Sequence, residues 1–317
     1  LRNEIGCDWE GIKQFFYRDI CNSSKNCLSA IEYLKYKEIG FTSINLLIRN
    51  LGGNFYISNY ILSLFFVIPL IQFCATFKRP FLAILVSFPY LITVIGLGTI
   101  RQSISIAFLT LCINEINKNR LYKHFFYSFI SSIFHYSSSI FIFLPLLIQN
   151  KMSINLNKIK KVLFLLFLFT FLFVIFNDNY FTQLLEAYLY RYHTPVSIKS
   201  PLLIWIIIAI PSAILLLNYD KYKQNDIYKF WRYYSIIGLS MFLSIFFNAV
   251  ISLRLLLYFL PIQIYVFSNS PDLKIFKNSP QNAYLGIIAF SFFILTIWLN
   301  FANHAYCYIP YENLLLK

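Results

Sequence analysis

Continuous apolar runs of close to 20 residues recur along the chain, and they constrain its fold more than any other feature. As a helix, such a run crosses a hydrocarbon core about 30 Å thick, and lipid offers no partner to an unpaired backbone N–H or C=O. A transmembrane barrel would instead show alternating segments of about ten residues. We therefore predict helical spans at 55–77, 81–99, 102–116, 162–176, 201–217, 233–251, 255–268 and 283–301.

The charge content also points to a membrane environment. Charged side chains make up 13% of the 317 residues, against about 25% in soluble domains. The net charge of +14 would suit a nucleic-acid partner, but the basic residues of membrane proteins collect in cytoplasmic connections. We therefore expect the lipid bilayer as a partner and no nucleic acid.

The basic connections set the expected orientation. Lys and Arg cluster in five of them, at 78–79, 117–123, 151–161, 219–232 and 274–277. Placing all five in the cytoplasm forces 124–149 to be a hairpin of two short helices with a kink at His135. One straight span is the alternative, and it would put the cluster at 158–161 outside. The segment 1–54, the loop 177–200 and the tail 302–317 then lie on the outer side.

Together these patterns predict an all-α polytopic integral membrane protein. We expect about 10 transmembrane or re-entrant helices around a cavity that faces the outer side. No internal repeat or low-complexity linker divides the sequence. Residues 1–317 are therefore expected to form a single membrane-embedded domain.

Cysteine placement agrees with this orientation. Cys74 and Cys112 fall in apolar spans, where a small hydrophobic side chain is the expected role. The other four cysteines fall on the outer side, where oxidation is permitted if that side is the periplasm; they are Cys7, Cys21, Cys27 and Cys307. A short loop closed by Cys21 and Cys27 is one hypothesis, although spacing alone does not fix the connectivity.

Two arginines embedded in apolar sequence are candidates for an anion site, since such charges are costly in a membrane. Arg101 follows Gly96-Leu97-Gly98-Thr99 and opens a helical run, so backbone donors and a positive dipole end accompany its guanidinium. Arg254 has no carboxylate within ten residues. The alternative without a function is that each arginine snorkels to the membrane interface or pairs with an acid of another helix. We expect both to bind pyrophosphate, with help from Arg191 in the outer loop.

Several further side chains are candidates for proton transfer or substrate contact. His135 lies among serines at the predicted kink and reads either as a catalytic group or as a structural histidine. Asp8 beside Trp9, and Glu38 near Phe41, are acids of the outer segment that are either bases or merely solvated. His193 lies in a loop rich in tyrosines, which stack on sugar rings but also form interfacial aromatic belts.

Known chemical motifs are otherwise missing from the sequence. No P-loop, zinc-ligand spacing, GxSxG or CxxC occurs, so the common nucleotide, metal and hydrolase sites are not predicted. We expect no cofactor and no metal.

A set of weak motifs in a fixed order carries a resemblance to a known family. They are Gly6-Cys7-Asp8-Trp9, Glu38-Ile39-Gly40-Phe41, Arg101-Gln102-Ser103, Phe134-His135-Tyr136-Ser137, Arg254 with Tyr258, and Tyr308-Ile309-Pro310-Tyr311. In this order the chain resembles the EpsG family of Wzy-type polysaccharide polymerases over nearly its whole length. Cys7 departs from the family pattern, in which threonine is common at that position.

The resemblance implies a metal-independent membrane glycosyltransferase of O-antigen or other surface-polysaccharide (lipopolysaccharide) biosynthesis. Such an enzyme lies in the bacterial inner membrane and transfers a growing glycan from undecaprenyl pyrophosphate to a lipid-linked repeat unit at the periplasmic face. A chain-length regulator is a possible partner. The missing Asp-x-Asp motif agrees with metal independence.

The resemblance also suggests roles for individual residues. Asp8 is the first choice for the base and His135 the second. The residues expected to contact substrate are Glu38, Gln102, His193 and Tyr258. Three other functions stay open: a lipid A-core O-antigen ligase with the same donor, a lipid-linked oligosaccharide transporter or flippase, and a membrane acyltransferase.

Overall fold

The computed structural model describes residues 2–18, 38–118, 120–148, 198–218, 226–272, 279–302, 304–309 and 312–313. Several predictions fall outside these ranges. They concern the span 162–176, the basic connection 151–161, Arg191 and His193 of the outer loop, and the Cys21–Cys27 pair.

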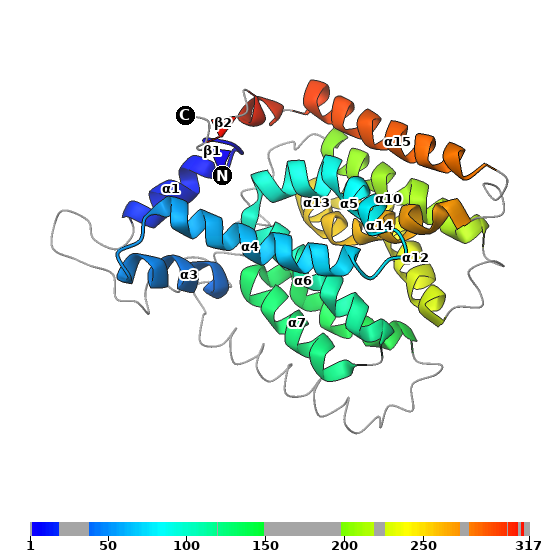
Figure 1. The fold of residues 1–317 in the computed structure, drawn as a ribbon, viewed down its shortest axis with the longest axis horizontal. Helices are drawn as coiled ribbons and strands as arrows, with labels where there is room; N and C mark the ends of the chain where they lie inside the picture. Colours follow the sequence, from blue (N-terminus) through cyan, green and yellow to red (C-terminus); the bar gives the residue numbers. More distant parts are fainter. Residues whose placement is uncertain are drawn as a thin grey trace.

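Helices dominate the described structure (Figure 1). The first half contains β1 (Arg2–Asn3), α1 (Trp9–Arg18), α3 (Ile39–Asn50), α4 (Phe55–Cys74), α5 (Pro80–Ser87) with its π-helical continuation η1 (Phe88–Gly96), α6 (Ile100–Asn117), α7 (Leu121–Phe134) and the 3-10 helix η2 (Tyr136–Ile148). The second half contains α10 (Lys199–Leu217), α12 (Asp226–Phe247), α13 (Ala249–Leu256), η4 (Leu257–Phe259), α14 (Pro261–Asn269), η5 (Ser270–Asp272), α15 (Pro280–Phe301), η7 (Ala305–Tyr308) and β2 (Glu312–Asn313).

Five helical segments of the described chain are long and apolar enough to cross a membrane. They are Phe55–Cys74, Lys199–Leu217, Tyr228–Phe247, Ala249–Asp272 and Pro280–Phe301. Helix α15 also exposes large apolar side chains, including Leu285, Phe292 and Phe293, as a lipid-facing helix must. The chain is therefore a multi-pass membrane protein, in agreement with the predicted class.

The structure corrects one predicted boundary. We expected spans at 233–251 and 255–268, but α12 ends at Phe247 and α13 begins at Ala249. The side chain of Asn248 causes the break, because its Oδ1 accepts hydrogen bonds from the backbone N–H groups of Val250 and Ile251 at 3.1 and 3.0 Å, as an N-cap does. Arg254 consequently lies in the last turn of α13 and not in a connection between spans.

Helix α6 packs between α4 and α7, and almost all of its side chains are buried. This position accounts for its mixed composition, because polar side chains in the interior need hydrogen-bond partners. Ser105 Oγ lies 2.9 Å from Ser131 Oγ of α7, and Ser131 also donates to the Ser105 carbonyl at 2.8 Å. Polar contacts of this kind tie the two helices together.

The segment 124–149 contains the predicted kink at His135, and α7 and η2 form an antiparallel hairpin around it. Ser131 Oγ lies 2.9 Å from Ser138 Oγ near the tip, and His124 Nε2 lies 3.3 Å from the Ile142 carbonyl further down. Each of these pairs joins a residue before His135 to a residue after it, and the pair further from the tip is the more widely separated in sequence. This pattern is that of a hairpin. The serines are thus hydrogen-bond partners within this element.

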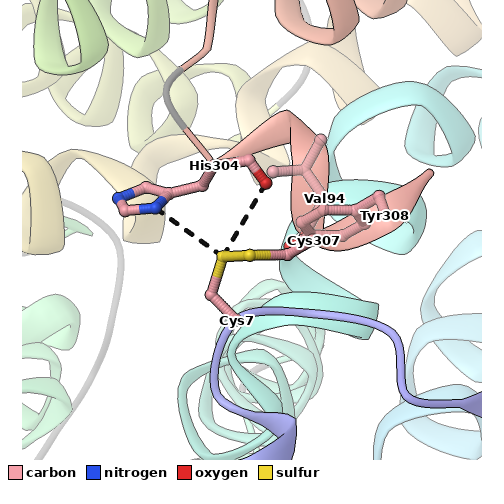
Figure 2. Close-up of a disulfide and its surroundings, with 5 residues drawn as sticks. All are labelled: Cys7, Val94, His304, Cys307 and Tyr308. Carbon is pink, nitrogen blue, oxygen red and sulfur yellow. Dashed lines mark hydrogen bonds between the residues drawn. A yellow bond between two sulfur atoms is a disulfide. The ribbon is translucent and has the colours of Figure 1, made fainter.

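The two ends of the described chain meet at one end of the molecule (Figure 1). Strand β1 pairs antiparallel with β2, with Arg2 opposite Asn313. A disulfide joins Cys7 to Cys307, whose Cα atoms are 5.2 Å apart (Figure 2). Beside it, Gly6 donates its N–H to the Cys307 carbonyl at 2.8 Å.

The joined ends rest on the turn that precedes α6. Tyr308 donates its hydroxyl to the Val94 carbonyl at 2.7 Å. Gly6 has a positive φ of 91°, and a Cβ there would collide with the Leu97 carbonyl, while a Cβ at Gly98 would collide with the Tyr308 hydroxyl. Glycine is therefore needed at both positions, and the two termini position the start of α6.

Candidate active site

Glu38, at the N-terminus of α3, is the central acid of the candidate site. It is the N-cap residue of that helix, and its carbonyl accepts hydrogen bonds from Thr42 N and Thr42 Oγ1, both at 3.0 Å. The residue is only 5% exposed. A buried carboxylate is costly unless it is paired, and Glu38 has two partners.

The first partner is Arg101, in the first turn of α6. Its Nη1 donates to Glu38 Oε2 in a salt bridge, and 30% of the arginine side chain remains exposed. The guanidinium carbon also lies 5.7 Å from the centre of the Phe41 ring, which is within cation–π distance. Arg101 thus pairs with an acid at the start of another helix, which is the alternative to anion binding that the sequence left open.

The second partner is His135, at the tip of the α7–η2 hairpin. Its Nδ1 lies 2.7 Å from Glu38 Oε1, and the side chain is 13% exposed. Its backbone N–H donates to the Ser131 carbonyl, and its own carbonyl accepts from Ser138 N and Oγ. The hairpin thus fixes the backbone of His135, and Glu38 fixes its ring.

Gly40 allows this approach between α3 and the hairpin. A Cβ at Gly40 would lie 3.1 Å from the Ile133 carbonyl oxygen and from Ile133 Cγ1, closer than nearly all real contacts of that kind. The motif Glu38-Ile39-Gly40-Phe41 therefore has a physical basis. It supplies the acid, the close approach and the aromatic ring for Arg101.

The electrostatics of the cluster keep Glu38 ionised. Burial alone would raise the pKa of its carboxyl, but the hydrogen bond with His135 and the charge of Arg101 outweigh burial and lower the pKa to about 2. Opposite charges and donated hydrogen bonds favour the ionised form. Glu38 is therefore an acceptor for both partners throughout the neutral range.

Gln102 and Tyr258 connect this cluster to the segment that carries Arg254. Gln102 Nε2 donates to the Arg254 carbonyl at 2.8 Å. The Tyr258 hydroxyl lies 2.9 Å from Ser137 Oγ, and Tyr234 donates to the Tyr258 carbonyl. Glu38, Arg101 and His135 thus form the cluster, and the residues that follow Arg101 and precede Ser138 in the chain link it to the backbone of Arg254 and to Tyr258.

Asp8 occupies a different place, directly before α1 and next to the disulfided Cys7. It is exposed, and its carbonyl accepts the N–H of Ile12 at 2.9 Å. The salt bridges among the described residues do not include it. The neighbouring Trp9 is buried against Phe55, with ring centres 4.9 Å apart. The structure brings the Gly6–Trp9 motif to the turn before α6, but it shows no contact between Asp8 and the Glu38 cluster.

Sequence reasoning missed the pairing of Glu38 with both Arg101 and His135. The available signal was that Glu38, Arg101 and His135 each belong to a motif of the family resemblance. Their separations of 63 and 97 residues gave no indication that they meet. Within the described residues, no group of three His, Cys, Asp or Glu could hold a metal ion.

The fold and the cluster define a multi-pass membrane protein with a buried carboxylate–guanidinium–imidazole site. The EpsG family model matches residues 1–313, and the chain belongs to the EpsG family. This membership indicates a function in polysaccharide biosynthesis at the membrane. No curated protein and no solved structure matches the chain.

Proposed function

We propose that the chain is a Wzy-type polysaccharide polymerase of the bacterial inner membrane. It transfers a growing glycan from undecaprenyl pyrophosphate to a lipid-linked repeat unit on the periplasmic side, without a metal ion. About ten transmembrane or re-entrant helices, of which five described segments are long and apolar enough to cross a membrane, would surround a cavity open to the periplasm.

One observation carries the proposal: five of the motifs behind the family resemblance converge on the sixth, Arg101-Gln102-Ser103 at the start of α6, or on the turn that precedes it. Glu38 and Arg101 form a salt bridge, His135 joins them, and Gln102 holds the peptide of Arg254. The Gly6 and Tyr308 motifs pack against the turn that precedes α6. A purely structural interior would have little need for such a concentration of polar groups, which are costly in lipid.

The chemistry of glycan transfer requires this kind of site. The C1–O bond to the pyrophosphate breaks, and the departing oxygen takes the electron pair and develops charge. Fixed guanidinium groups stabilise such charge in place of a metal. We propose that the guanidinium groups of Arg101 and Arg254 supply this charge, because Gln102, next to Arg101 in the chain, holds the peptide of Arg254.

The pairing with Glu38 changes the expected role of Arg101 in one respect. An arginine that is already oriented by a salt bridge and an aromatic ring loses little further entropy when it binds phosphate. We propose that Glu38 holds Arg101 in place for the donor, and that Arg191, outside the described residues, contributes a further charge. His193, Gln102 and Tyr258 are the proposed substrate contacts.

Deletion of the gene and analysis of the glycan ladder on a gel test the proposal. A strain that lacks a polymerase keeps single repeat units on the final acceptor and loses all longer products, and the wild-type gene restores them. Loss of even the single capped unit would contradict the proposal and favour a ligase or a flippase. An unchanged ladder would exclude all three functions in this pathway.

A further inference from the structure

We propose that His135 accepts the proton of the acceptor hydroxyl, and that Glu38 is the positioning residue that turns its Nε2 toward the substrate. This inference rests on the proposed function and deepens it. It reverses the order suggested by the sequence, in which Asp8 came first.

The hydrogen-bond roles in the cluster determine the tautomer of His135. Ionised Glu38 only accepts hydrogen bonds, and its Oε1 lies 2.7 Å from Nδ1 of His135. The proton of the neutral ring therefore resides on Nδ1, and Nε2 carries a lone pair. The same logic orients the histidine of the serine-protease triad.

The observation that suggests a ligand is the state of Nε2 of His135. It is buried and has no hydrogen-bond partner among the described residues. Buried polar atoms are rarely left unsatisfied, because each one costs free energy. A hydroxyl that donates to Nε2 would satisfy this atom, and the acceptor sugar supplies hydroxyl groups.

Arg101 restrains Glu38 from the other side. It occupies Oε2 while His135 occupies Oε1, so the carboxylate has one oxygen for each partner. Arg101 therefore opposes rotation of the carboxylate away from the ring. The buried histidine of the same hairpin, His124, differs, since each of its ring nitrogens lies 3.3 Å from a backbone carbonyl.

The proposed step balances in atoms and electrons. The acceptor oxygen forms a bond to C1 of the donor sugar as its proton passes to Nε2 of His135. The C1–O bond to the pyrophosphate breaks, and its electron pair leaves with the phosphate oxygen. The resulting imidazolium is stabilised by Glu38 and afterwards returns its proton to the released pyrophosphate or to water.

The test measures the rate of repeat-unit addition against pH with full-length protein in proteoliposomes and a lipid-linked repeat unit as the only substrate. We expect His135→Asn, whose amide still donates to Glu38, to slow addition by about 10²–10⁴-fold. His304 is exposed and lies beside the disulfide (Figure 2), so His304→Gln is the matched control and should leave the rate within about twofold. Size-exclusion chromatography verifies that each variant is folded.

Glu38→Gln separates positioning from a merely structural role. Among the described residues, Glu38 of α3 contacts the ring, Arg101 of α6 pairs with the same carboxylate, Tyr136 follows His135 in the chain, and Tyr258 of η4 contacts Ser137 of the hairpin. Without the carboxylate the imidazolium loses its counter-ion, so the acid limb of the rate profile should shift to lower pH as the maximal rate falls. Glu38→Asp should recover part of the wild-type profile.

The outcomes distinguish the two levels of the proposal. If the wild-type protein adds no repeat units, the proposed function fails, and this inference fails with it. If the wild-type protein polymerises and folded His135→Asn does so equally fast, the inference alone is wrong. The inference would also be wrong if the acid limb of the rate profile did not shift in Glu38→Gln. It would equally be wrong if the acid limb disappeared in Asp8→Asn.

Discussion

Arg101 makes its contacts through a planar guanidinium, and lysine does not reproduce that geometry. It pairs with Glu38 while it lies over Phe41, and a lysine ammonium is a single point that cannot also fork to a phosphate. We predict that Arg101→Lys fails nearly as badly as Arg101→Ala, each with a loss of about 10²–10³-fold in polymerisation rate. Glycan length in cells that express equal amounts of each variant gives the measurement.

Arg79 offers a matched control for this prediction. It forms a bidentate salt bridge with Asp272 at 2.9 and 2.8 Å and contacts Tyr284, but it lies outside the candidate site. Arg79→Ala should retain polymer length, apart from any fall in abundance. Normal polymer from both Arg101→Ala and Arg254→Ala would place the pyrophosphate site elsewhere and make these arginines packing residues.

Glu38 gives the fold a specific acid sensitivity. Its folded pKa of about 2 lies below the value of about 4.3 for a free glutamate. Its ionised form therefore stabilises the fold above about pH 4.3, and this contribution is lost as the pH falls toward about 2. We predict that Glu38→Gln lowers the melting temperature in detergent at pH 5, and that its difference from wild type disappears as the pH falls to about 2. A difference that persists at pH 2 would contradict the assigned pKa.

At the scale of elements, the turn before α6 depends on a close contact with the C-terminal segment. A Cβ at Gly98 would occupy the position of the Tyr308 hydroxyl, which donates to the Val94 carbonyl. We predict that Gly98→Ala lowers both the melting temperature and the polymer length. Tyr308→Phe in the same chain should recover part of the loss, because it removes the clashing oxygen.

Gly286 supplies the control for this turn. A Cβ there meets nothing within 4 Å, and the residue lies within α15, so Gly286→Ala should be neutral or slightly stabilising. A non-additive cycle between Gly98→Ala and Tyr308→Phe would demonstrate the contact. Additive effects of the two substitutions would show that the turn and the C-terminal segment are independent.

The elements show which features a sequence can predict and which it cannot. Apolar length predicted α4, α10 and α15 well, because crossing a bilayer is a property of the run itself. The cap at Asn248 was missed, since an asparagine inside an apolar run looks the same whether or not its side chain caps a helix. The π-helical turns Phe88–Gly96 were also missed, because hydropathy does not distinguish them from an α-helix.

In the candidate site too, some features could be predicted from the sequence and others could not. Arg101 was a candidate because a charge embedded in apolar sequence is informative, and His135 was a candidate because it lies in a motif of the family resemblance. Their shared partner Glu38 was predicted to be a base, a solvated acid or a substrate contact, but not their partner, since pairing across 63 and 97 residues depends on how α3 packs beside α6 and α7. The Cys7–Cys307 bond, with its separation of 300 residues, was equally inaccessible from spacing.

At the scale of the whole molecule, the disulfide joins the two ends of the described chain. We predict that a non-reduced digest contains a Cys7 peptide linked to a Cys307 peptide, and that reduction releases both. Cys307→Ser should lower the stability by about 2–4 kcal/mol, whereas the buried free Cys74, changed to Ser, should not alter the linked peptide. Free alkylation of Cys7 in untreated protein would show that the bond does not form in the cell.

The orientation of the molecule is the last prediction, and α6 makes it testable. This helix has 18 residues, so its ends are about 27 Å apart, close to the thickness of a hydrocarbon core. Arg101 lies at one end and Lys118 directly follows the other, within a basic connection that the positive-inside rule assigns to the cytoplasm. The disulfide near the Arg101 end requires an oxidising compartment. We therefore expect the α1 end to face the periplasm.

Labelling of intact cells with a membrane-impermeant maleimide tests this orientation. In a background with Cys21 and Cys27 changed to serine, the remaining cysteines are either disulfide-bonded or buried. Glu10→Cys, at an exposed position of α1, should react from outside, and Lys118→Cys should react only after the cells are opened. The reverse pattern would turn the molecule over in the membrane, and it would place the Glu38–Arg101–His135 cluster on the side where a periplasmic polymerase has no substrate.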